Sequence, residues 1–77
     1  MLKGYLETRG IYKETILISP ITGHTFSIER LIECIEKIGK EESFLHVLNI
    51  LPFRNDTKLL INYLSGIGEG YLRKIAL

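Results

Sequence analysis

The chain has 77 residues, of which 45% are hydrophobic and 25% charged, and its formal net charge is +1 at pH 7. Its length indicates one small domain spanning residues 1–77, and its hydrophobic content is too high for a disordered chain. The near-neutral charge does not favour nucleic acid or acidic lipid as a partner.

The few metal-binding and nucleophilic residues narrow the chemistry further. One cysteine and two histidines exclude an internal disulfide and a four-ligand structural zinc site. The spacing of His24, Cys34 and His46 does not bring a nucleophile, a base and an orienting group together, so we assign no catalytic residue and no metal ligand. No Gly-Lys-Ser phosphate loop is present, and we expect no cofactor.

The N-terminal segment does not have the pattern of a secretory signal. Lys3 and Glu7 interrupt it, and no long apolar core follows. No run approaches the roughly 18 apolar residues of a membrane span. We therefore expect a protein of a reducing compartment, the cytoplasm or the nucleus, with no membrane partner.

The first predicted element is an N-terminal β-hairpin, about residues 2–18. Residues 2–8 and 11–18 are rich in Tyr, Ile, Leu and Thr, and Arg9-Gly10 separates them. Pro20 has no N–H to donate to a ladder, so the second strand should end before it.

A central amphipathic helix, residues 27–39, follows the hairpin. Thr25 or Ser27 can cap its start, and Gly39 can take the left-handed conformation at its end. Its apolar residues recur with the helical period and form one stripe: Ile28, Leu31, Ile32, Ile35 and Ile38.

Residues 41–51 predict a second helix, with a short strand as the alternative. The segment is apolar around most of its circumference, which calls for burial on more than one side. Its β-branched residues also favour a strand, so both alternatives are kept. Pro52 should end either element.

The last part of the chain predicts a third helix and a final helical piece. Asn55 or Asp56 can cap the third helix, and Gly66 is the expected stop. Three glycines between residues 66 and 70 predict a tight turn, after which Tyr71–Leu77 forms the last helical piece. The predicted fold is thus α+β, with the hairpin packed on the central helix and two or three further short helices.

The turn Gly23-His24-Thr25-Phe26 and the helix after it resemble the centre of a U-box. Leu31 and Ile35 stand at the apolar helix positions of that family, and Leu51-Pro52 is similar to its entry into the last helix. A U-box keeps the shape of a RING finger without zinc, which agrees with the small number of metal ligands here. The resemblance implies a domain that recruits a ubiquitin-conjugating enzyme and promotes ubiquitin transfer without a covalent intermediate.

The resemblance also implies a contact surface for the conjugating enzyme. Its expected residues come from the first loop, the helix and the second loop: Leu6, Thr8, Leu31, Cys34, Ile35, Leu51 and Pro52. A core position is the alternative for the helix residues, because an apolar stripe usually faces inward. The family's Cys-Pro-Ile loop reads Leu6-Glu7-Thr8-Arg9 here, and its Asp-Pro reads Lys40-Glu41-Glu42, so ligase activity is left open.

An interaction protein without catalytic activity is a first alternative. An inhibitor or an oligomeric adaptor would explain the surplus of Leu and Ile without any motif. Pairing of two copies through Phe44–Leu51 would bury apolar surface that a chain of this size leaves exposed, so a homodimer is among the expected assemblies.

A second alternative is binding of a DNA phosphate backbone through residues 64–75. The segment resembles a helix-hairpin-helix motif, in which the N–H groups of a Gly-x-Gly turn hold a phosphate. The candidate residues are Gly66, Gly68, Arg73 and Lys74. A plain connection between two helices explains the same glycines without a ligand.

Overall fold

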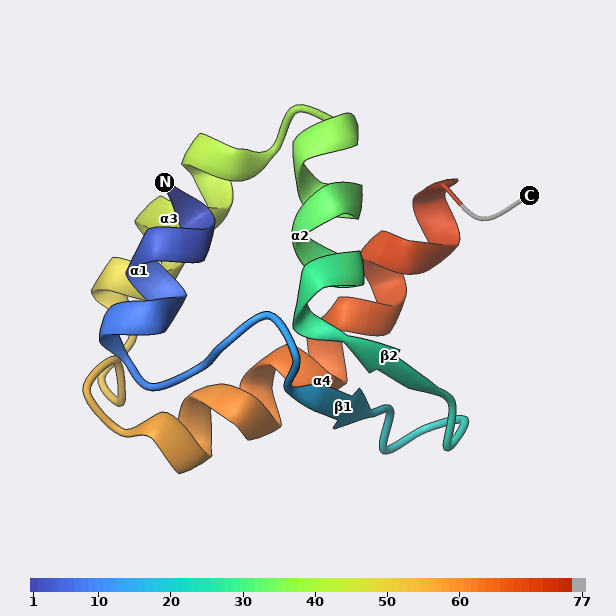
Figure 1. Ribbon diagram of the computed structural model, residues 1–77, viewed down its shortest axis with the longest axis horizontal. Helices are drawn as coiled ribbons and strands as arrows, with labels where there is room; N and C mark the ends of the chain where they lie inside the picture. The colour runs from blue at the N-terminus through green and yellow to red at the C-terminus, as the bar shows by residue number, and fades with distance from the viewer. Residues whose placement is uncertain (76–77) are drawn as a thin grey trace.

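A computed structural model describes residues 1–75 of the chain (Figure 1). Within these residues, the structure has four helices and a two-stranded antiparallel hairpin, which confirms the predicted α+β class. The elements in chain order are α1 (Leu2–Thr8), β1 (Ile16–Ile18), β2 (Thr25–Ser27), α2 (Ile28–Lys37), α3 (Glu41–Ile50) and α4 (Thr57–Ile75).

The segment predicted as the first strand of the hairpin is instead helix α1. Its apolar residues fit both periods, because Leu2 and Leu6 share a face in a strand and also in a helix. The helix adds Tyr5 to that face, and the Tyr5 hydroxyl donates to the Leu48 carbonyl of α3 at 3.4 Å. The backbone N–H of Leu2 donates to Glu41 Oε2 at 3.1 Å. Contacts with α3 thus select the helix, and α1 lies beside α3 (Figure 1).

The hairpin is therefore formed later in the chain than predicted, by β1 and β2. Leu17 lies opposite Phe26, and both are buried on the inward face. Ile16 and Ile18 of β1 lie opposite Ser27 and Thr25 of β2 on the other face, which we call the outer face of the hairpin. Pro20 follows β1, as expected for a residue that cannot donate to the ladder.

The central helix α2 matches its prediction closely. The Ser27 hydroxyl accepts the backbone N–H of Arg30 at 3.1 Å and caps the start. Gly39 has a φ of +71°, the left-handed conformation that ends a helix. The face with Ile28, Leu31 and Ile35 is buried, which orients α2 toward the hairpin and α4.

Helix α3 confirms the helical alternative for residues 41–51. It is buried at Phe44 and Leu48 and partly covered at Leu45. The ring of Phe44 contacts that of Tyr71 edge to face, with a centroid distance of 5.4 Å, which ties α3 to the end of α4.

Helix α4 is continuous over 19 residues, so the predicted stop at Gly66 and the turn after it are wrong. Asp56 caps its start as expected, since its Oδ1 accepts the Leu59 N–H at 3.2 Å. The buried positions Leu60, Leu64 and Gly68 recur every four residues and face the hairpin and α2. Packing along this face offsets the roughly 1 kcal/mol that each helical glycine costs relative to alanine. The final helical piece predicted for Tyr71–Leu77 is the end of α4, which extends to Ile75. Residues 76–77 lie outside the described residues.

Candidate functional site

The residues expected to contact a conjugating enzyme do not form one surface. Leu31 is 1% exposed, and it shares the core with three other predicted contacts: Leu6, Cys34 and Ile35. Thr8 and Pro52 are exposed and Leu51 is half-buried. Because the other four predicted contacts are buried, they do not connect these three residues into one surface patch. The apolar stripe of α2 therefore faces inward, and these four buried side chains are not available to a partner in this fold.

The expected phosphate-binding turn is also not formed. Gly66 and Gly68 lie inside α4, where the backbone N–H groups belong to the helical hydrogen-bond pattern instead of pointing at a ligand. Gly68 is buried against the ring of Phe26, while Arg73 and Lys74 are exposed on the last turns. DNA binding through this segment required a glycine turn between two helices, and the continuous helix α4 takes its place.

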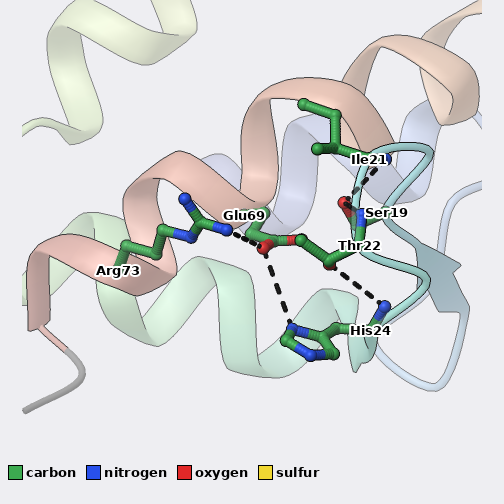
Figure 2. Close-up of polar contacts among 6 residues, drawn as sticks. All are labelled: Ser19, Ile21, Thr22, His24, Glu69 and Arg73. Carbon is green, nitrogen blue, oxygen red and sulfur yellow. Dashed lines mark hydrogen bonds and ion pairs between the residues drawn. The ribbon is translucent and has the colours of Figure 1, made fainter.

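A polar cluster joins the hairpin loop to α4, with Glu69 at its centre (Figure 2). The side chain of Glu69 is only 10% exposed. Its Oε1 accepts the Thr22 hydroxyl at 2.6 Å, and its Oε2 accepts Arg73 Nη2 at 2.8 Å. His24 Nδ1 lies 3.8 Å from the same Oε2. The carboxylate therefore holds the loop between β1 and β2 against the side of α4.

Ser19 organises the loop that Glu69 holds. It is buried, and its Oγ accepts the backbone N–H groups of Ile21 and Thr22, each at 3.3 Å. Gly23 has a φ of +77°, a conformation that a residue with a Cβ adopts only with strain. The loop is thus fixed by local hydrogen bonds as well as by Glu69, and it presents Ile21 to solvent at 83% exposure.

The chemistry of this cluster is that of a structural anchor. Hydrogen bonds from Ser19 and Thr22, and then the bond and charge of Arg73, hold the pKa of Glu69 below its ordinary value of 4.5, although burial acts in the opposite direction. A carboxylate already engaged by several donors and easily ionised is a weak proton acceptor. We therefore assign Glu69 to anchoring the loop.

Sequence reasoning missed this cluster. The i,i+4 spacing of Glu69 and Arg73 was visible, but the predicted turn at residues 66–70 removed both from a common helix face. Thr22 is 47 positions before Glu69, so no local pattern links them. Only the course of α4 past the hairpin loop brings these groups together.

A hollow of about 570 Å³ opens beside β2, next to the cluster. Arg30 and Arg73 bring two positive charges to it and Glu69 one negative charge, which leaves one positive charge in excess with His24 neutral. Phe26 and Leu72 contribute apolar surface, and Thr25 and Ser27 contribute hydroxyls. The hollow is open to solvent, and its lining combines charged, hydroxyl and apolar groups.

Besides the hollow, the outer face of the hairpin is a second candidate binding surface. Ile16 and Ile18 are 59% and 60% exposed there, although Leu17 between them is buried. Tyr12 before β1 and Ile21 after it are also exposed. Large apolar side chains therefore concentrate in a segment of ten residues around β1.

Comparisons with protein-family models, with curated proteins and with solved structures found no match for this chain. No relative therefore bears on the resemblance to a U-box. Among residues 1–75, no three or more His, Cys, Asp or Glu side chains are grouped to hold a metal ion. None of the helices in this range has the length and apolar character needed to cross a membrane.

Glu69→Gln is expected to change the pH dependence of stability. Because the pKa of Glu69 is lower in the folded than in the unfolded chain, its contribution is complete above pH 4.5 and is lost as the pH falls through the folded value. The variant should thus be less stable than the native chain at neutral pH, and the difference should shrink below pH 4.5. Urea unfolding from neutral pH down to about pH 3 measures this difference.

Thr22→Val, which removes one of the hydrogen bonds to the carboxylate, should show a smaller change of the same sign. A Glu69→Gln difference that stays constant over the whole pH range would show that the carboxylate is not anchored in this way.

Proposed function

We propose that this chain is a small protein-binding domain whose contact surface is the outer face of the β1–β2 hairpin. The observation that supports this most directly is the exposure of Ile16 and Ile18. Strands with one face on the core usually alternate apolar and polar residues, with the polar ones outward. In β1 the outward residues are apolar as well, which is typical of a surface completed by another protein.

The resemblance to a U-box makes a ubiquitin-conjugating enzyme the first partner class to test. Docking by the helix residues of that family is not compatible with the burial of Leu31, Cys34 and Ile35. A conjugating enzyme would instead meet the hairpin and its loop. Ubiquitin-ligase activity is part of the proposal only if such binding is found.

If the chain is an interaction protein without catalytic activity, we propose the same outer face of the hairpin as its contact surface. Self-association through α3 receives less support, because Phe44 and Leu48 already pack inside the domain and leave Val47 and Ile50 as its exposed apolar residues. With Ile21 of its loop, the hairpin exposes one more large apolar side chain than this helix, and it is the better candidate for a contact with either a second copy or another protein.

The test compares the native chain with two double variants. Ile16→Thr with Ile18→Thr removes the apolar outer face while keeping β-branched residues that favour the strand. Ile50→Thr with Leu59→Thr is the matched control, because it removes two exposed apolar residues on α3 and α4. Each immobilised protein is tested first against purified ubiquitin-conjugating enzymes and then against a cell extract, and the Kd of each recovered partner is measured.

The hairpin variant should bind its partner at least about tenfold more weakly, since each isoleucine contributes roughly 1.5 to 3 kcal/mol when it is fully buried. The control should bind like the native chain. Equal binding by all three proteins, or an equal loss in the control, would refute the hairpin as the contact surface.

A further inference from the structure

Strand β2 has one edge that pairs with no other strand in the described residues. The bonds from Ile28 N–H to the Thr15 carbonyl, at 2.9 Å, and from Ser19 N–H to the His24 carbonyl, at 2.8 Å, mark hydrogen-bonded pairs at the two ends of the ladder. In an antiparallel ladder such pairs alternate with pairs that are not hydrogen-bonded. Thr25 and Ser27 belong to the second kind, so their backbone N–H groups point away from β1.

The free edge of β2 and the hollow beside it form one site. Thr25, Phe26 and Ser27 all line the hollow, so β2 forms one wall of it. Arg73 is already paired with Glu69 at 2.8 Å. Arg30, at the start of α2, has no ion-pair partner within residues 1–75. The site thus combines unpaired backbone groups with an arginine available for an anion.

We infer that this site binds an extended acidic segment of a partner protein, which adds to β2 as a third strand and places a carboxylate on Arg30. The inference rests on the proposed function and specifies the partner segment. An extended backbone supplies the donors and acceptors that the edge of a sheet needs. A carboxylate matches the excess positive charge and can accept two parallel hydrogen bonds from a guanidinium.

The other occupants fit the site less well. A small free anion would satisfy Arg30 but leave the backbone N–H groups of Thr25 and Ser27 without a partner. A second copy paired edge to edge through β2 would bring two positively charged hollows together, which charge repulsion disfavours. A third strand from a partner also extends the outer face, since side chains alternate and every second one would stand on the same side as Ile16 and Ile18.

The experiment is a ¹⁵N NMR titration of the chain with a blocked hexapeptide in which valine alternates with glutamate. The amide signals of Thr25 and Ser27 should shift with saturation, and Arg30→Gln should weaken binding about tenfold, the usual scale for loss of a charge-assisted hydrogen bond. Arg54→Gln is the matched control, an exposed arginine outside the hollow, and should bind like the native chain. Two control peptides replace glutamate by lysine or carry N-methyl groups that block strand pairing, and both should bind at least about tenfold more weakly.

Four results would overturn the inference. The first is no shift at Thr25 and Ser27, and the second is equal binding of the lysine or N-methyl peptide. The third is that acetate or inorganic phosphate reproduces the shifts with the same affinity, which would indicate an anion site without strand addition. The fourth is that Thr25 and Ser27 signals depend on the concentration of the chain alone, which would identify a second copy as the occupant.

Failure of the peptide titration is distinct from failure of the proposed function. If the peptide does not bind but a partner is lost with the Ile16 and Ile18 variant, the hairpin is a binding surface and only the acidic third strand is refuted. If the peptide binds and that variant still binds its partners, the outer face is refuted as the main contact.

Discussion

Leu31→Asp is expected to unfold the domain at room temperature. Leu31 is 1% exposed on α2, within the core that α2 shares with α4, so the substitution removes apolar packing and introduces a carboxylate without a partner. Truncation of a buried leucine to alanine alone costs about 2–5 kcal/mol, and burial of a charge adds to this. Domains of this size rarely have more than about 3–5 kcal/mol of stability. Circular dichroism should therefore show loss of helix.

The control for this substitution is Glu33→Asp, two residues further along α2. Glu33 is exposed, so the same aspartate there should change the free energy of unfolding by no more than about 0.5 kcal/mol. If Leu31→Asp instead folds like the native chain and loses only partner binding, then Leu31 is a surface contact as in a U-box, and this face of α2 does not pack on α4.

Gly68→Val should destabilise the domain by about 2–3 kcal/mol because it overpacks the contact between α4 and β2. A Cβ at this position would lie 2.7 Å from Phe26 Cζ and 2.8 Å from its Cε2. Phe26 is itself buried in the hairpin, so its ring would have to shift to admit the added side chain. The absence of a Cβ at Gly68 therefore allows α4 to approach the ring of Phe26 this closely. Urea unfolding measures the loss as a lower midpoint.

Gly70→Val is the matched control, since no atom beyond its chain neighbours and the local helix backbone lies within 4 Å of the Cβ that it would add. It should leave stability nearly unchanged or raise it slightly, because valine is a better helix former than glycine. Equal destabilisation at both positions would contradict the account. A large loss at Gly70 would indicate a turn with positive φ in place of the continuous helix.

The parts of the fold that the sequence predicted are those with local causes. Helix α2 carries its own apolar stripe, a cap at Ser27 and an end at Gly39, so its boundaries follow from residues within it. Helix α1 could not be predicted because Leu2 and Leu6 fit a strand as well as a helix, and contacts with α3 decide between them. The choice depends on tertiary contacts that local propensity does not contain.

Helix α4 and the candidate site were missed for a related reason. Three glycines lower helix propensity, and together they favour a turn when only neighbouring residues are considered. Packing of Gly68 against Phe26 decides the outcome, and these residues are far apart in the chain. Once α4 continues past Gly66, Glu69 reaches Thr22 and the hollow beside β2 is formed. The predicted contacts at Leu31 and Ile35 became core residues by the same packing.

The central claim is that the hairpin of this domain is a protein-binding surface. Hydrogen–deuterium exchange of the chain, free and bound to a partner recovered with it, tests this directly. The account predicts slower exchange in the complex within residues 12–27, which include β1, β2 and the loop that Glu69 anchors. Protection confined to α3, with exchange in residues 12–27 unchanged, would contradict it.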